Sequence, residues 1–357
     1  MLPSVVKVIL ICLYASLCLC CIEATVNILR NSSVPAVMAF GDSFMDSGNN
    51  NFRETLVKAD FPPYGKDFVG GKPTGRFSNG KTLADYIVEK LGVKDYLPAY
   101  LDPSLQDEDM VTGVSFASAG SGFDPLTAKL LNVFSSRDEI EMFKEYIVKL
   151  KRIVGEEEAN DITAKSLYLV SWSFNDWAIS YTAIPIRRIQ YDEAAYANLL
   201  VEKATEFIQE MYKLGARKMV FFNTPILGCF PIARTVGGGV FRKCGDKFSE
   251  EAQTFNTKLN RQIQYLGSTL PQSRFTIVDY FKIVQDIVDH SLQYGLEVVD
   301  RGCCGTGAVE VAVLCNKLSP ICPDDSKYLF WDSIHLTDKG YNIVVDHALQ
   351  DVMNTVI

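Results

Sequence analysis

The chain has 357 residues, of which 48% are hydrophobic and 22% are charged, and its formal net charge is −8. These values are typical of a globular protein with a full hydrophobic core, and they exclude a disordered or fibrous chain. A negative balance without a dense block of lysine and arginine also argues against nucleic acid as a partner.

The chain begins with the pattern of a secretory signal peptide. Lys7 precedes an apolar run over residues 8–22, and small residues follow near Ala24. The run is shorter than the ~20 residues that a membrane-spanning helix needs, so an uncleaved anchor is the weaker interpretation. We therefore expect a signal peptide over residues 1–24, a single domain over residues 34–356, extracellular secretion and no stable membrane insertion after cleavage. Asn31 opens an Asn-Ser-Ser sequon and is a candidate glycosylation site.

The first part of the mature chain predicts a buried strand that runs into a serine turn. An apolar run over residues 34–40 is followed by Gly41, Asp42 and Ser43, which favour a turn. The Gly- and Pro-rich residues 60–80 predict a surface loop, and Asn79 is expected to cap a helix that ends near residue 91.

Strand and helix patterns then alternate to the end of the chain. Further strands are predicted over residues 111–117, 166–170, 218–222 and 275–278. Further helices are predicted over residues 136–154, 192–214, 249–266, 280–294 and 337–356. The first of these helices opens with a capping box in which Ser136 and Glu139 are the expected partners.

This alternation predicts the fold class. Strands that alternate with helices form a parallel sheet with helices on both faces, which is a three-layer α/β/α architecture. No linker, repeat or charge block divides the chain, so one domain is expected. In such sheets the functional site lies at the carboxyl ends of the strands. Ser43, Gly120 and Asn175 each follow a predicted strand and could meet at that edge.

Two distant segments together indicate nucleophilic catalysis. A serine nucleophile needs a base, and the base needs a carboxylate that orients it. Asp332 and His335 lie three residues apart, so one carboxylate could hold Nδ1–H and leave Nε2 for the Ser43 hydroxyl. The alternative is a turn serine and a surface histidine, but His290 and His347 lie in amphipathic helices and are weaker candidates for a base.

Other polar and aromatic residues have two interpretations each. Asn175 could donate its amide to a developing oxyanion or could cap a helix. Gly120 could supply a second donor, through its own N–H or that of Ala119, or could belong to a flexible loop. The aromatic residues Trp172, Phe174 and Trp177 could line an acyl pocket, although core packing is equally compatible with the pattern.

Six of the ten cysteines lie beyond the signal segment, and an even number in a secreted chain predicts disulfides. We expect Cys229 to pair with Cys244, because they bracket one loop. The spacing leaves the pairing of the other four open, namely Cys303, Cys304, Cys315 and Cys322. A zinc site is the weaker alternative, because paired C-x-x-C motifs are missing.

Several blocks in the correct order resemble the plant GDSL esterase/lipase family of the SGNH hydrolase superfamily. They are residues 40–43, 46–50, 113–120, 175–176, 225–231, 303–305 and 328–335. The resemblance implies a flavodoxin-like fold and a small-molecule acyl ester or lipid substrate, without a metal or cofactor. It also implies Ser43 as nucleophile, His335 as base and Asp332 as its orienter, with oxyanion donors at Ser43 N–H, Gly120 and Asn175.

Three positions depart from the family pattern. This chain has Ser115 where the family usually has Asn, Ala119 where it has a first Gly, and Ser173 where it has Gly. Residues 113–117 also come close to a G-x-S-x-G nucleophile elbow, but the last glycine is missing. We therefore expect a secreted serine esterase. An extracellular acyltransferase with the same triad and a catalytically impaired binding protein are the alternatives.

Overall fold

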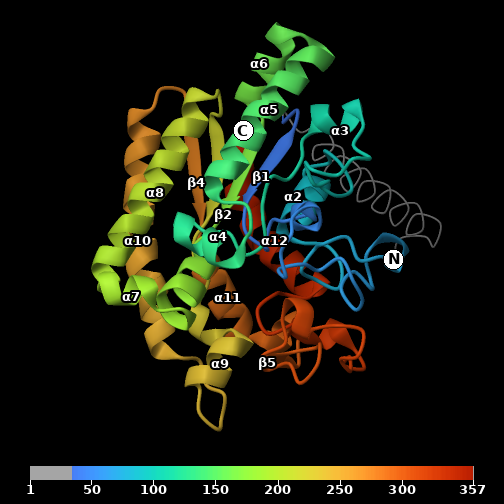
Figure 1. Ribbon diagram of the computed structural model, residues 1–357, viewed down its shortest axis with the longest axis vertical. Helices are drawn as coiled ribbons and strands as arrows, with labels where there is room; N and C mark the ends of the chain where they lie inside the picture. The colour runs from blue at the N-terminus through green and yellow to red at the C-terminus, as the bar shows by residue number, and fades with distance from the viewer. Residues whose placement is uncertain (1–33, 357) are drawn as a thin grey trace, which may run out of the picture.

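A four-stranded parallel sheet forms the centre of the computed structural model, which describes residues 34–356 (Figure 1). The strands are β1 (Val37–Gly41), β2 (Leu167–Ser171), β3 (Lys218–Phe222) and β4 (Arg274–Val278), hydrogen-bonded in the order β1-β2-β3-β4. This confirms the predicted α/β class with a parallel sheet. The predicted signal peptide and Asn31 lie outside the described residues.

The predicted strand over residues 111–117 is wrong at its start, because helix α3 (Asp107–Thr112) takes its first two residues. Residues 114–118 nevertheless run parallel to β1 at its free edge. Ala39 donates its N–H to the carbonyl of Val114 (3.2 Å), and Phe116 donates to the carbonyl of Ala39 (2.8 Å). Only a single β-bridge forms there, at Ser115, whose other side pairs with residues 98–100. With this segment counted second, the spatial order is 2-1-3-4-5, as in flavodoxin-like sheets.

Helices cover both faces of the sheet (Figure 1). On one face lie α5 (Ser136–Val154), α8 (Glu193–Lys213) and α10 (Asp246–Thr269). On the other lie α2 (Leu83–Lys90), α11 (Tyr280–Asp289) and α12 (Asp338–Val356). The shorter helices are α4 (Pro125–Leu131), α6 (Glu156–Lys165), α7 (Ile186–Gln190) and α9 (Pro231–Gly237), and β5 (Val298–Gly302) pairs with β6 (Tyr328–Phe330). Within residues 34–356, no helix combines the length and apolar character needed to cross a bilayer.

Two expected helix caps have different partners in the structure. Helix α2 is capped by Thr82 with Asp85, whereas the Asn79 amide oxygen accepts the N–H of Asp338 at the start of α12 (2.8 Å). Helix α5 is capped by Ser135 with Asp138. Glu139, one residue later, points inward and is fully buried. Both corrections arise because a polar side chain near a helix start can bond to a distant segment instead of to its own helix.

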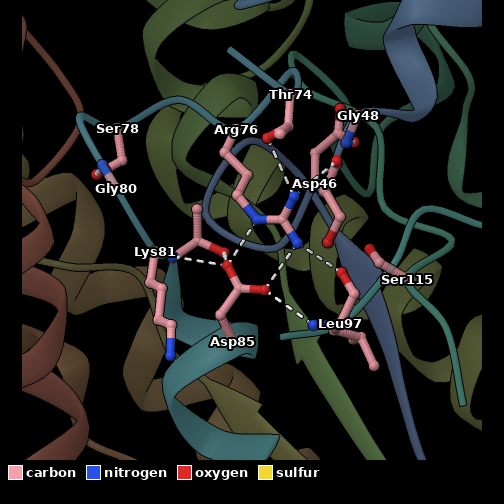
Figure 2. A network of polar contacts seen from close by, with 12 residues as sticks. Asp46, Gly48, Thr74, Arg76, Ser78, Gly80, Lys81, Asp85, Leu97 and Ser115 are labelled. Carbon is pink, nitrogen blue, oxygen red and sulfur yellow. Dashed lines mark hydrogen bonds and ion pairs between the residues drawn. The ribbon is translucent and has the colours of Figure 1, made fainter. Parts of the chain in front are cut away.

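Residues 60–80 form a loop as predicted, but only part of it lies at the surface: residues 69–72 are exposed, whereas residues 75–80 are buried. Arg76 makes a bidentate ion pair with Asp85, at 2.7 Å from Nε and 2.8 Å from Nη2, and also donates to the carbonyls of Ser47 and Leu97 (Figure 2). Burial alone would raise the pKa of Asp85, but the Arg76 guanidinium and the N–H groups of Thr82 and Leu97 together outweigh it and lower that pKa. The pair therefore ties the chain beyond the serine turn to α2.

Replacing Asp85 should unfold the protein more easily, because Asp85→Asn leaves a buried guanidinium without its counter-charge. We expect the free energy of unfolding to fall by about 3–5 kcal/mol in urea titrations. The matched control is Asp346→Asn, which breaks the ion pair with Lys90 on the surface, where Asp346 is 57% exposed. That change should cost at most about 1 kcal/mol, and equal losses in the two variants would contradict a structural role for the Arg76 pair.

Candidate active site

Three residues from the two ends of the domain form one hydrogen-bonded chain. The Oγ atom of Ser43 lies 2.7 Å from Nε2 of His335. Nδ1 of His335 lies 2.8 Å from Oδ2 and 3.0 Å from Oδ1 of Asp332. All three side chains are buried. The structure thus brings together the serine, the imidazole and the carboxylate that the sequence singled out, across 292 residues.

The Asp332 carboxylate shapes the turn that presents His335. Its Oδ1 accepts the backbone N–H groups of Ile334 (2.8 Å) and His335 (2.7 Å), so one side chain fixes both the turn and the imidazole. Its Oδ2 accepts the hydroxyl of Tyr64 at 2.8 Å. Burial and the Asp332 charge raise the pKa of Tyr64, which keeps its proton as a donor.

Tyr64 is a site residue that the sequence analysis missed. It lies in the segment interpreted as a surface loop, and its Oη also accepts the N–H of Ala312 (2.9 Å). No local pattern marks it, because its partners lie far along the chain. It packs with Phe77 and Trp331, and the Phe77 ring lies 4.7 Å from the His335 ring.

Two buried carboxyl groups bond to the backbone of the serine turn. The N–H of Gly41 donates to Oε2 of Glu139 (3.0 Å), and the N–H of Phe44 donates to Oδ1 of Asp42 (3.1 Å). Burial raises the pKa of both carboxyl groups well above the ordinary range. Gly41 has φ +145°, and a Cβ there would lie 2.2 Å from the Ser171 carbonyl oxygen, so only glycine fits where the chain leaves β1.

The polar stretch after the serine fastens this turn to residues 115–119. Asp46 accepts the N–H of Ala119 (2.9 Å), and Asn50 donates to the carbonyl of Ala119 (2.9 Å). Asn49 donates to the carbonyls of Ser115 (2.9 Å) and Ala117 (2.8 Å). The Ser115 hydroxyl donates to the carbonyl of Met45 (2.8 Å), so this departure from the family pattern is itself a tie to the turn. The sequence indicated residues 46–50 only through the family resemblance, which gave them no role.

Two backbone donors face no acceptor next to the serine. Among the described residues, neither the N–H of Ser43 nor that of Gly120 has a hydrogen-bond partner. The alternative donor Ala119 is excluded, because its N–H is taken by Asp46. Gly120 has φ +85°, a conformation that favours glycine.

Asn175 lies beside these donors and makes no helix-capping hydrogen bond. Its amide nitrogen donates to the carbonyl of Ser121 (3.0 Å) and to Oδ2 of Asp42 (3.3 Å). The longer bond to Asp42 is the weaker of the two. Asn175 could therefore turn this hydrogen toward an oxyanion while the bond to Ser121 keeps it in place.

The three aromatic residues near Asn175 have different environments. Trp172 donates its indole N–H to the Ser121 hydroxyl (3.2 Å) and packs in the core against Phe207. Phe174 and Trp177 line an apolar pocket of about 310 Å³. Trp172 is therefore a core residue, whereas Phe174 and Trp177 line the pocket.

The six cysteines of the described residues form disulfides rather than a zinc site. Cys229 is bonded to Cys244, the pairing expected from the sequence. The other pairs, which the sequence left open, are Cys303–Cys322 and Cys304–Cys315. Cys303, Cys304 and Cys315 pack with Trp331, immediately before Asp332, so the crosslinks support the segment that carries the carboxylate.

A family model and the curated relatives agree on one family. The family model described as GDSL-like Lipase/Acylhydrolase matches residues 37–348. A GDSL esterase/lipase of Arabidopsis thaliana is 46% identical over 94% of this chain and 90% of its own length. The Arabidopsis thaliana GDSL esterase/lipase EXL3 is 44% identical over 96% of this chain and 94% of its own. Among solved structures, an α/β hydrolase from the metagenome of Lake Arreo aligns with a TM-score of 0.45 at 10% identity, covering 92% of this chain and 99% of that one.

Ser173 should carry backbone strain that glycine would relieve. It has φ +100°, where a side chain is disfavoured, and its hydroxyl pairs with that of Thr224. Ser173→Ala and Ser173→Gly both lose this hydrogen bond, so their difference reflects the strain, reduced by the larger conformational entropy that glycine loses on folding. We expect the glycine variant to be more stable by roughly 1–2 kcal/mol in thermal or urea unfolding. A more stable alanine variant, as at an ordinary position, would contradict the strain.

Proposed function

The chain belongs to the GDSL-like lipase/acylhydrolase family, and we propose on this basis that it is a carboxylic ester hydrolase that uses Ser43, His335 and Asp332 as its catalytic triad. The observation that carries the proposal is the continuous hydrogen-bonded chain from Ser43 Oγ through His335 to Asp332. Buried groups in this order form an activated nucleophile with an oriented base. The substrate class is a small-molecule ester or lipid, as the family implies.

The geometry supports acyl transfer to the serine as the first step. Ser43 Oγ attacks the ester carbonyl carbon while Nε2 of His335 takes the hydroxyl proton, and Asp332 stabilises the imidazolium. Electrons of the carbonyl bond move to its oxygen, which becomes the oxyanion. The free N–H groups of Ser43 and Gly120 donate to that oxygen, together with the Asn175 amide once it leaves Asp42. His335 then gives its proton to the departing alcohol.

Release of the acyl group uses the same residues in reverse. His335 takes a proton from a water molecule, whose oxygen attacks the acyl carbon, and the serine oxygen leaves with a proton from Nε2. If an alcohol replaces water, the same step makes a new ester. Product analysis with an added acceptor alcohol therefore separates hydrolysis from acyltransfer.

We further propose that the protein is secreted as a single domain, residues 34–356, after removal of the signal peptide over residues 1–24. The disulfides of the cysteine-rich loops support this, because such crosslinks persist in oxidising compartments. N-terminal sequencing of protein recovered from the medium should find a start near residue 25 and a glycan on Asn31. An intact N-terminus on protein retained in cells would contradict this proposal.

Removal of the nucleophile tests the triad directly. Ser43→Ala should lower kcat on p-nitrophenyl esters by at least about 10³-fold and abolish labelling by a fluorophosphonate probe. The matched control is Ser47→Ala in the same buried stretch, because the Ser47 hydroxyl makes no hydrogen bond in the described part of the chain. It should keep both activity and labelling, whereas a labelled or active Ser43→Ala protein would reject the triad.

The oxyanion role of Asn175 has a separate signature. Asn175→Ala should lower kcat by about 10²–10³-fold, because one donor to the oxyanion is lost. KM should change little, since the donor acts mainly in the transition state. Fluorophosphonate labelling should continue at a reduced rate. A change in KM alone would assign Asn175 to substrate binding instead.

A further inference from the structure

Asp332 has one hydrogen-bond donor that does not come from its own turn. The backbone N–H groups of Ile334 and His335 and the imidazole Nδ1 all lie within three residues of it. The fourth donor, the Tyr64 hydroxyl, lies 268 residues away along the chain and is 2.8 Å from Oδ2. Tyr64 is therefore the residue that fixes a carboxylate oxygen of Asp332 against another segment of the domain.

The hydrogen of the Tyr64 hydroxyl is directed at this carboxylate. Tyr64 Oη also accepts the backbone N–H of Ala312 (2.9 Å), and a backbone N–H can only donate. The oxygen meets that N–H with a lone pair, so its single hydrogen is left for Asp332. Burial and the Asp332 charge raise the pKa of Tyr64 well above its ordinary value, so the phenol keeps this hydrogen at neutral pH.

Contacts outside the triad hold the tyrosine ring in place. Tyr64 is only 1% exposed and packs with Phe77 and Trp331, at ring-centroid distances of 5.6 and 6.5 Å. Ala312 lies in the loop that the disulfide between residues 304 and 315 closes. The ring packing and the crosslinked loop therefore set the position of the hydroxyl group independently of the turn that carries His335, as a preorganised site requires.

A donor at Oδ2 of Asp332 affects the base in two ways. Oδ2 also lies 2.8 Å from Nδ1 of His335, so the Tyr64 hydroxyl limits rotation of the carboxylate and keeps this oxygen facing the imidazole. It also draws negative charge away from the oxygen that stabilises the imidazolium. Without the hydroxyl group the carboxylate would rotate more freely and would favour the imidazolium more strongly. His335 would then act as a base only at higher pH.

We propose that Tyr64 is a positioning residue of the triad, which acts through Asp332 and sets both the orientation of His335 and the pH at which His335 begins to accept a proton. The inference rests on the proposed esterase function and adds a residue to that same site. Among the described residues, the hydroxyl group of Tyr64 bonds to Asp332 and Ala312 and to neither Ser43 nor His335. Its effect on the reaction therefore passes through the carboxylate.

Other titratable groups also lie around the triad. Tyr341 on α12 is close enough to sense the charges of Asp332 and Asp42, and Tyr280 on α11 senses that of Asp42. Neither of these two hydroxyl groups has a hydrogen-bond partner within residues 34–356. All of these groups stay in place when Tyr64 is changed, so a shift of the pH profile would report on Tyr64.

Tyr64→Phe removes the hydroxyl group and keeps the ring. On p-nitrophenyl esters we expect kcat to fall by about 10- to 100-fold, as for the loss of a hydrogen bond to a charged group, with little change in KM. The acid limb of the kcat/KM profile should move to higher pH by roughly 0.5–1 pH unit, because the imidazolium is favoured. Rates are divided by the number of sites that a fluorophosphonate probe labels, so that a loss of folded protein is not counted as a loss of catalysis.

Two other tyrosines provide matched controls. Tyr341→Phe removes a buried hydroxyl group that has no hydrogen bond among the described residues, and it should keep both kcat and the pH profile. Tyr146→Phe removes a buried hydrogen bond to the carbonyl of Met110 (2.6 Å) in the core. It should lower the melting temperature and leave the kinetics per labelled site unchanged.

A double-mutant cycle tests whether Tyr64 acts through Asp332. Asp332→Ala should lower kcat by itself, because it removes the group that orients the base. In that background Tyr64→Phe should change kcat by less than about 2-fold, since the acceptor of its hydroxyl group is already gone. A further loss of about 10-fold in that background would show that Tyr64 acts by another route and would overturn the proposal.

The remaining outcomes separate this role from the esterase function itself. An unchanged acid limb in Tyr64→Phe, with or without a loss of kcat, would overturn the role of Tyr64 and leave the esterase intact. A Tyr64→Phe protein with no label and no cooperative melting transition would also overturn it, because the hydroxyl group would then be required for folding. If the wild type cleaved no ester and Ser43 took no label, the proposed function would fail first and the role of Tyr64 with it.

Discussion

The buried carboxylate of Asp332 is the constraint around which the site is organised. It is fully buried and ionisable, so it must be surrounded by donors, and it has four: two backbone N–H groups, the His335 imidazole and the Tyr64 hydroxyl. Each donor belongs to a segment that is supported by another part of the fold. The cysteine crosslinks support Trp331 just before it, and the loop of residues 60–80 supplies Tyr64. The imidazole then reaches Ser43 with its geometry already set.

The opposite half of the site is held by side chains that bond to the backbone. Glu139 holds the N–H of Gly41, and Asp46 and Asn50 bind Ala119 from both sides. In the described part of the chain the buried N–H groups of Ser43 and Gly120 have no partner, which makes them available for the oxyanion role proposed above. The serine turn and residues 115–120 are loops, so their precise positions depend on these hydrogen bonds and on the adjacent edge of β1.

Several buried carboxyl groups bond to the segments that they hold together. Glu139 and Asp46 both accept backbone N–H groups, and Asp85 has its arginine, so each is explained by the structure that it holds together. Glu251 lines an apolar pocket, and its Oε2 has no hydrogen-bond partner among the described residues.

Local patterns in the sequence were sufficient for the parallel sheet, the main helices, the strand ends that bear Ser43 and Asn175, and the turn that joins Asp332 to His335. Each depends on residues a few positions apart, whose periodicity or turn chemistry is visible in one stretch. Only the tertiary structure decided that Tyr64 bonds to Asp332 and that Glu139 bonds to Gly41 instead of to the start of its own helix. The same holds for Asn79, which caps α12. The tertiary structure also placed residues 114–118 beside β1 after a helix that the sequence did not predict. A buried polar group takes whichever partner the folded loops bring to it, and that partner has no fixed spacing along the chain.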